Sequence, residues 1–118
     1  MLEPLFTYQN KEKLKSRKKI KYIFEQGKSI KTYPILIRYV ESDLEYQQVG
    51  VSVSKRNFKN AVDRNRIKRQ LREAYRLHKS QLLNKGKNYS IMILYIGKTH
   101  LGSEKIHKVI HTLLNDIK

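Results

Sequence analysis

One stretch of the chain, residues 59–76 (KNAVDRNRIKRQLREAYR), concentrates the side chains that could bind a charged partner. Five of its residues are Arg and two are Lys, while only Asp63 and Glu73 oppose them. At helical spacing the apolar residues fall on one face and most cations on another, where like charges at i, i+4 repel each other. Phosphates arriving at such a face relieve the repulsion and release counterions. The pattern therefore favours a nucleic acid as the partner.

The alternative explanation is an ordinary solvated helix face, which is what a run of charges usually is. Ten cations against two anions between Lys55 and Lys79 make that explanation the weaker one here. Arg outnumbers Lys within the expected helix, and its planar guanidinium suits bidentate phosphate recognition. These observations leave open whether the nucleic acid is RNA or DNA.

The composition of the whole chain agrees with a polyanionic partner. Its 118 residues carry 26 Lys plus Arg against 10 Asp plus Glu, a formal net charge of +16. The length predicts a single domain over residues 1–118, with residues 1–12 as an irregular arm. The sequence has no cysteine, no apolar run long enough for a membrane span and no secretory leader. We therefore expect a soluble, cytoplasmic protein without a membrane partner.

Periodicity and capping signals predict the elements that position the cationic stretch. Helices are expected over residues 17–26 with Ser16 as N-cap, over residues 61–79 with Asn60 as N-cap, and over residues 103–117. Strands are expected over residues 33–40, 49–54 and 89–96, with a polar hairpin over residues 41–47 and room for a short strand between Gly27 and Tyr33. Residues 79–87 are expected to hold a short helical turn. The order predicts an α+β sandwich, in which helices pack on one mainly antiparallel sheet.

The expected strand over residues 49–54 (VGVSVS) alternates between valines and small residues. The valines point to one face, which we expect to be the core. Gly50, Ser52 and Ser54 point to the other face and give it little side-chain bulk. We therefore expect an open, accessible sheet surface there.

The last helix carries a possible metal pair. His107 and His111 are spaced i, i+4, and Glu104 lies one turn earlier on the same edge. His pairs at this spacing can bind a metal. Because no further ligand can be identified, these residues are better explained as ordinary boundary residues of the helix.

A second group of acidic residues could in principle hold a hydrated magnesium ion. Glu41, Asp43 and Glu45 alternate as they would on a strand, so all three could face one way. A solvated hairpin explains them better. Because spacing ties no Ser, His and carboxylate grouping together, we predict no catalytic protein residue and no protein-bound metal.

The motif around the cationic stretch resembles the signature helix of the bacterial ribonuclease P protein subunit. The letters NAV (residues 60–62) are followed by RNRIKR (residues 64–69) and preceded by VSVSK (residues 51–55). A basic N-terminal segment with Leu14, a first helix carrying Phe24, and Gly27 fit the family in order. The resemblance thus covers nearly the whole chain.

This resemblance implies an accessory protein of a ribonucleoprotein endonuclease that removes the 5′ leader from precursor tRNA. In that family the RNA subunit holds the catalytic Mg²⁺ ions, the protein assists binding of the leader and the metals, and no further protein partner is required. The family fold is an α+β sandwich with a left-handed βαβ crossover, which a sequence pattern alone would not predict.

Carried over to this sequence, the resemblance implies two RNA-binding surfaces. The residues expected to contact the catalytic RNA are Lys55, Arg56, Asn60, Arg64, Asn65, Arg66, Lys68, Arg69, Arg72 and Arg76. The residues expected to line a cleft for the single-stranded leader are Lys13, Arg17, Ile20, Phe24, Arg38, Tyr39, Ser52 and Ser54. On general grounds Phe24 is more simply a core residue, because its i, i+4 partner is apolar; the resemblance favours a stacking role instead.

The sequence departs from the family pattern in the expected cleft. Ile20 stands where the first helix often carries an aromatic residue, and Arg38 stands where the first long strand commonly has tyrosine. Stacking on an aromatic ring is worth roughly 1–3 kcal/mol per base. We therefore expect leader contacts that are more electrostatic, with Tyr39 or Tyr33 as a substitute platform.

Two other classes of function remain open from the sequence. A structural RNA-binding protein, such as a small ribosomal component, would need no more than the same charge. A self-sufficient metal-dependent nuclease would have to use Glu41, Asp43 and Glu45.

Overall fold

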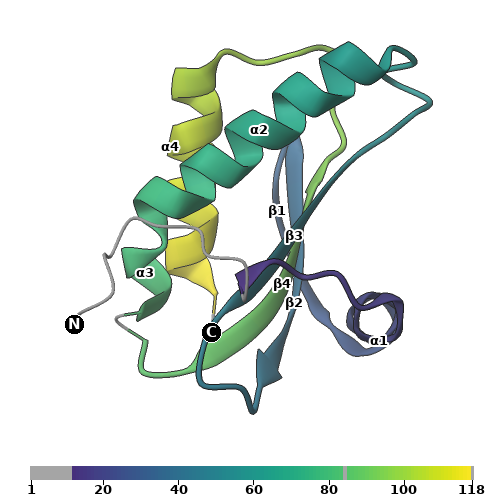
Figure 1. Ribbon diagram of the computed structural model, residues 1–118. Helices are drawn as coiled ribbons and strands as arrows, with labels where there is room; N and C mark the ends of the chain where they lie inside the picture. Colours follow the sequence, from purple (N-terminus) through teal and green to yellow (C-terminus); the bar gives the residue numbers. More distant parts are fainter. Residues whose placement is uncertain (1–11, 84, 118) are drawn as a thin grey trace.

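The structure is a computed structural model that describes residues 12–83 and 85–117, so most of the predicted arm over residues 1–12 lies outside the described residues. Helices and strands follow one another along the chain as shown in Figure 1. In order they are α1 (Arg17–Gln26), β1 (Lys28–Thr32), β2 (Ile35–Ser42), β3 (Gln48–Val53), α2 (Ala61–His78), α3 (Ser80–Leu83), β4 (Asn88–Tyr95) and α4 (Ser103–Asp116).

The four strands form one sheet in the order β1-β2-β4-β3. The β1/β2 and β2/β4 pairs are antiparallel and the β3/β4 pair is parallel, so the expected mainly antiparallel α+β fold is confirmed. The expected strand between Gly27 and Tyr33 is also present, as β1.

The hairpin predicted over residues 41–47 is wrong. β4 lies between β2 and β3, because it is buried on both faces and therefore takes a central position with two partners. The connection ends at Gln47, whose side-chain amide donates to the Lys87 carbonyl at 3.0 Å and whose Oε1 accepts from the Tyr89 amide at 2.6 Å. These bonds hold the connection beside the start of β4. The antiparallel hairpin is formed instead by β1 and β2.

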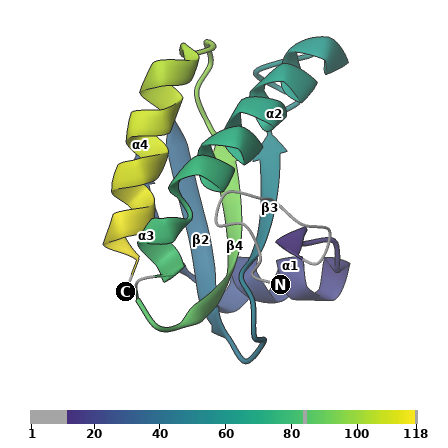
Figure 2. The ribbon, with the colours of Figure 1, turned by 60° about the vertical axis from the view of Figure 1, so that its left-hand side comes forward.

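The connection from β3 through α2 to β4 is left-handed. In Figure 2, α2 lies in front of the sheet, and β4 lies to the left of β3 with both strands running upward. Nearly all parallel βαβ connections have the opposite hand. The handedness implied by the family resemblance is therefore present in this chain.

Two helices cover one face of the sheet and one covers the other. α2 and α4 pack on the first face (Figures 1 and 2), where the main core includes Ile37, Val49 and Ile93. α1 packs on the second face over a small cluster in which Ile23 and Met92 are buried. Over the described residues, much of the second face is consequently left without a covering helix.

The first described residues run along the free edge of β3. Lys13 forms a parallel bridge with Val49, and the Leu14 amide donates to the Val49 carbonyl at 3.0 Å. Just before them, the carboxylate of Glu12 lies 2.9 Å from the Lys79 ammonium, and both side chains are buried. This segment therefore joins β3 to the end of α2 and forms one wall of the space next to α1.

Candidate nucleic-acid interface

The cationic stretch forms one exposed surface of α2. The helix begins after Asn60, whose side chain accepts from the Val62 amide at 2.8 Å, as predicted for an N-cap. Its apolar side is buried at Ile67 and Leu71. The side chains that lie away from the core are here called the cationic surface: Asn65, Arg66, Lys68, Arg69, Arg72 and Arg76. Lys68 and Arg76 are half-buried and the others are exposed.

Arg64 has a structural role that the sequence did not reveal. Its guanidinium donates to the carbonyls of Phe58 and Lys59 at 2.8 and 2.9 Å. The residue is half-buried, and the two bonds fix the turn that leads into α2. Arg64 therefore presents only part of its donor capacity to a partner.

Two further predicted residues lie in the turn between β3 and α2. Lys55 and Arg56 are exposed there, directly before the helix. The Ser54 hydroxyl accepts from the amides of Arg56 and Asn57 at 3.2 and 3.4 Å. Ser54 thus shapes the turn that carries the two cations.

One charge of the cationic surface is partly offset within the helix. Arg76 hydrogen-bonds Glu73, with Nε donating at 3.1 Å and one terminal nitrogen also in contact. This hydrogen bond lowers the pKa of Glu73, so the carboxylate stays ionised at neutral pH. The electrostatic potential of the cationic surface is therefore set mainly by its cations other than Arg76.

A cleft, here called the central cleft, lies where the N-terminal segment, α1, β3, β4 and α2 meet. Its volume is about 440 Å³. The residues that line it are Lys13, Leu14, Lys15, Ile20, Val49, Gly50, Val51, Arg72 and Met92. Lys13 and Ile20 were predicted here, and Arg72 was predicted for the cationic surface. The two predicted surfaces therefore meet at Arg72.

The sequence missed several lining residues of this cleft. Met92 belongs to a strand that is apolar on both faces, so alternation places it opposite Ile91 and Ile93 but does not say which face is the main core. Gly50 allows Met92 and Leu14 to pack closely against β3, because a Cβ there would lie 2.7 Å from the Met92 sulfur and 3.4 Å from the Leu14 carbonyl oxygen. Gly50 itself is buried, so the expectation of an open, accessible surface over the small residues of β3 is wrong at this position.

Arg38 anchors α1 to the sheet. Its guanidinium donates to the carbonyls of Phe24 and Gly27 at 2.8 and 3.1 Å and to the Ser29 hydroxyl at 2.6 Å. Phe24 lies in the last turn of α1 and Gly27 directly follows it, where backbone acceptors lack intrahelical partners. Arg38 therefore has a structural role that the sequence did not reveal, and its contact with the leader stays a prediction.

Phe24 lies on the exposed side of α1. Its side chain is 42% exposed, and the Arg38 guanidinium lies 5.9 Å from its ring centroid. The sequence left a core role and a stacking role open for Phe24. Because its ring is accessible, the position is compatible with stacking.

Of the remaining residues predicted for the leader cleft, Arg17, Tyr39 and Ser52 do not line the central cleft. Tyr39 is 5% exposed and belongs to the main core, on the sheet face opposite α1, where its ring packs edge-on against Tyr89. It cannot line the cleft, and the prediction for it is wrong. Arg17 is exposed on α1 and Ser52 is half-buried on β3. Tyr33 is exposed but lies in the turn between β1 and β2.

The two histidines of the last helix have a neighbour that spacing could not reveal. His78 of α2 approaches Nδ1 of His107 with its Nε2 and Nδ1 of His111 with its Nδ1, each at 3.3 Å. Burial, followed by the charges of His107 and His111, lowers the pKa of His78. His78 meets its neighbours through different ring nitrogens, so the rings form a chain of contacts.

The acidic residues considered for magnesium do not share a strand face. Glu41 is the second-last residue of β2, whereas Asp43 and Glu45 lie in the bend that follows. The Glu41 carboxylate is 3.7 Å from the Lys87 ammonium. Within residues 12–83 and 85–117, no group of three or more His, Asp or Glu side chains is arranged to hold a metal ion. In the same residues, no helix is long and apolar enough to cross a bilayer.

Fold and surface together define a class: a small α+β protein with a left-handed crossover, a cationic helix and a cleft beside it. The family model described as Ribonuclease P matches residues 8–118. The chain belongs to the ribonuclease P protein family.

Curated relatives and solved structures agree with this assignment. The chain is 43% identical over 84 residues to a ribonuclease P protein component of Porphyromonas gingivalis, covering 69% of this chain and 61% of that protein. It is 39% identical over 74 residues to the one of Petrotoga mobilis, covering 63% and 62%. The chain thus matches about three fifths of the length of these relatives.

Two solved structures share the fold. The RNase P protein of Staphylococcus aureus matches with a TM-score of 0.75 at 24% identity, over 87% of this chain and 92% of that chain. The RNase P protein of Thermotoga maritima matches with a TM-score of 0.74 at 24% identity, over 91% and 98%. At this identity the likeness concerns the fold alone.

Proposed function

We propose that this chain is the protein subunit of ribonuclease P, which binds the catalytic RNA and the 5′ leader of precursor tRNA. It promotes the magnesium-dependent endonucleolytic removal of the leader in the cytoplasm. The RNA subunit holds the Mg²⁺ ions that carry out the cleavage, and no side chain of the protein acts as a catalyst. Neither a protein-bound cofactor nor a further protein partner is needed.

The observation that carries the proposal is the junction of the cationic surface with the central cleft. Arg72 belongs to the same face of α2 as Lys68 and Arg69, and it also lines the cleft. A folded RNA held on α2 by its phosphates would therefore lie beside a single strand held in the cleft. Phosphate contacts of this kind give affinity that falls steeply with salt.

The composition of the cleft suits a single strand. Lys13 and Arg72 can contact a backbone, while Ile20 and Met92 offer apolar surface to bases. Single-stranded nucleic acids are commonly bound by cations that follow the backbone and by aromatic side chains on which the bases stack. Phe24 on the neighbouring helix adds an accessible ring.

Reconstitution tests this function directly. Precursor tRNA cleavage is measured at low Mg²⁺ with a bacterial catalytic RNA, with and without the protein. We expect stimulation by the wild-type protein and a reduced effect for Arg69→Ala, while Lys31→Ala on the opposite edge of the sheet serves as a charge-matched control. Absence of stimulation by the wild-type protein would reject the proposal. Equal binding to ribosomal RNA fragments and to precursor tRNA would favour a general structural RNA-binding protein instead.

A further inference from the structure

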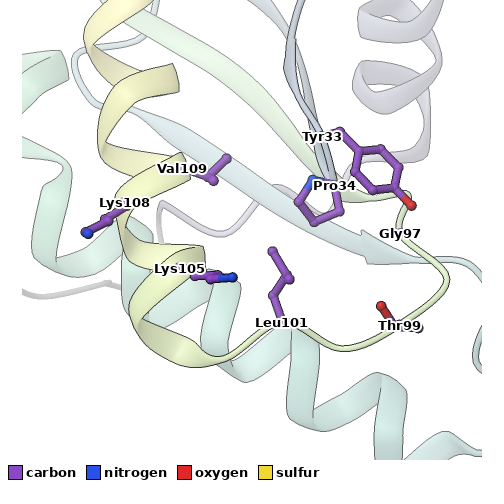
Figure 3. A pocket seen from close by; sticks show the side chains of 8 residues that line it. All are labelled: Tyr33, Pro34, Gly97, Thr99, Leu101, Lys105, Lys108 and Val109. Atoms are coloured by element: carbon purple, nitrogen blue, oxygen red, sulfur yellow. The ribbon is translucent and has the colours of Figure 1, made fainter.

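A second pocket lies at the end of the sheet where β4 leaves it, and it shares no lining residue with the central cleft. It is enclosed by the turn between β1 and β2, by the segment from β4 to α4, and by the first turns of α4 (Figure 3). Its volume is about 360 Å³. This is near the lower end of the range for small-molecule sites, which suits one nucleotide better than a base pair.

The floor of the pocket is apolar and one wall is aromatic. Pro34, Leu101 and Val109 supply the apolar surface. Tyr33 stands at the edge, with its hydroxyl directed toward Gly97 (Figure 3), and its side chain is 64% exposed. A base could stack on the exposed tyrosine ring with one of its faces and pack against the apolar floor with the other.

Lysines stand on the α4 side of this pocket. Figure 3 shows the Lys105 side chain directed into the pocket from α4, whereas the Lys108 side chain is directed away from it. Lys98 is exposed in the adjoining segment. Among the described residues that line the pocket, none is acidic. An apolar ligand would gain nothing from these cations, whereas the phosphate of a nucleotide would.

The pocket is held in shape by hydrogen bonds behind it. The Tyr95 hydroxyl donates to the Thr99 carbonyl at 2.6 Å and accepts from the Leu101 amide at 2.9 Å. The Asn57 side chain donates to the Gly97 carbonyl at 3.2 Å. The segment between β4 and α4 is thereby tied to the sheet and to the turn before α2. A ligand would find the pocket already formed, which lowers the entropic cost of binding.

The same segment connects the pocket to α2. His100 contacts the side chain of Gln70, and Gln70 lies one helical turn after Arg66 on the same side of the helix. Arg66 is exposed. An RNA that contacts Arg66 would therefore lie on the side of α2 to which this segment is attached.

We propose that this pocket binds one unpaired nucleotide of the RNA that lies on α2, with its base against Tyr33 and Leu101 and its phosphate at Lys105. This inference rests on the proposed function, since that function supplies the RNA. It adds an RNA contact on the side of α2 that faces α4, away from the central cleft.

The test uses two measurements on the full-length protein. In the first, amide resonances are followed by NMR while a single-stranded uridine pentanucleotide is added. We expect saturable shifts at Gly97, Thr99 and Leu101 that are lost in Tyr33→Ala. Tyr22→Ala removes another exposed tyrosine, located on α1, and should leave those shifts in place.

In the second measurement, affinity for the bacterial catalytic RNA is compared between wild type, Tyr33→Ala and Lys105→Ala. Loss of one stacked base typically lowers affinity by roughly 5- to 150-fold, so we expect a drop of at least fivefold for Tyr33→Ala. Lys28→Ala, an exposed cation of β1, serves as the control for loss of one charge. Thermal unfolding verifies that the variants fold, as expected for exposed side chains.

The outcomes separate this inference from the proposed function. If the wild-type protein stimulates precursor cleavage, but Tyr33→Ala binds the catalytic RNA as tightly as wild type and the pentanucleotide leaves Gly97 unshifted, the pocket assignment is overturned and the function stands. If the wild-type protein fails to stimulate cleavage, the function itself is rejected. A concentration-dependent dimer that Tyr33→Ala abolishes would also overturn the assignment, because a second copy of the chain would then occupy the pocket.

Discussion

Replacing Arg38 by alanine should loosen α1 from the sheet and lower the stability of the protein. The side chain makes three hydrogen bonds of 3.1 Å or less, to two carbonyls at the end of α1 and to the Ser29 hydroxyl. A hydrogen bond to a charged group contributes about 1.5–3 kcal/mol when the partner cannot be replaced by water. Here the end of α1 is partly exposed, so water recovers part of the loss. We therefore expect a destabilisation of about 2–3 kcal/mol in total.

Thermal unfolding followed by circular dichroism measures this loss. For a domain of this size, about 1 kcal/mol corresponds to roughly 4 °C, so the midpoint should fall by about 8–12 °C. Lys28→Ala removes one exposed cation from the neighbouring strand and should change the midpoint by about 2 °C at most. Hydrogen exchange of the α1 amides adds a local readout, since α1 packs on a small cluster separate from the main core and proteins open locally in such units.

Arg38→Lys distinguishes an anchor from an RNA contact. Lysine keeps the charge but cannot span three acceptors in the plane of a guanidinium, so it should recover less than half of the lost stability. Suppose instead that Arg38→Ala unfolds at the same temperature as Lys28→Ala, and that Arg38→Lys restores leader binding. Arg38 would then act as a cation toward RNA, and the anchoring role derived from its hydrogen bonds would be refuted.

Three further predictions concern α2, the central cleft and the histidines. Arg64→Ala should lose about 1–2 kcal/mol of stability in denaturant unfolding, because two loop carbonyls lose their donor. Arg66→Ala should change stability by no more than about 0.5 kcal/mol and should weaken RNA binding in filter assays at low salt. Equal stabilities of the two variants would contradict the structural role of Arg64. Gly50→Val places atoms where the Met92 sulfur and the cleft now lie. The preference in binding affinity for precursor over mature tRNA should therefore fall by roughly fivefold or more. An unchanged preference would exclude the cleft as the leader site. The pKa of His78 is lowered in the folded state, so the folded state binds this proton less readily than the unfolded state, where the pKa is near 6.5. Protonation of His78 therefore favours unfolding: stability is fully present above that pH and decreases as the pH falls through and below it. Thermal midpoints between pH 8 and pH 5 should decrease more in wild type than in His78→Gln, and parallel curves would contradict this.

The helices could be predicted from the sequence because their ends are defined locally. α1 begins and ends at the predicted residues, with the Ser16 hydroxyl accepting from the Lys19 amide at 3.2 Å. Gly27 follows because any Cβ there would collide with the Ile23 carbonyl oxygen. α2 likewise begins directly after Asn60. Capping involves residues two to four positions apart, so a single sequence contains the information.

The faces of β2 could not be predicted, because they depend on contacts between distant segments. Alternation places Arg38 and Tyr39 on opposite faces, but it does not say which face the two long helices cover. Tyr39 is buried because α2 and α4 lie on its side of the sheet. Arg38 meets α1 because α1 lies on the other side. The hairpin prediction failed for the same reason, since β4 pairs with residues of β3 that are 42 positions away and with residues of β2 that are 46 to 60 positions away.

The junction at Arg72 was likewise hidden from the sequence, and it changes how the two RNA-binding surfaces should be understood. Helical spacing assigned Arg72 to the cationic surface, whereas the cleft depends on where residues 13–15 run along β3. Because one guanidinium borders both surfaces, phosphates bound on either side of it would share its charge. Energetic effects at neighbouring sites with a shared partner are not additive. The leader and the catalytic RNA would therefore not bind independently: removing Arg72 should weaken both, and it should reduce the extent to which each assists binding of the other.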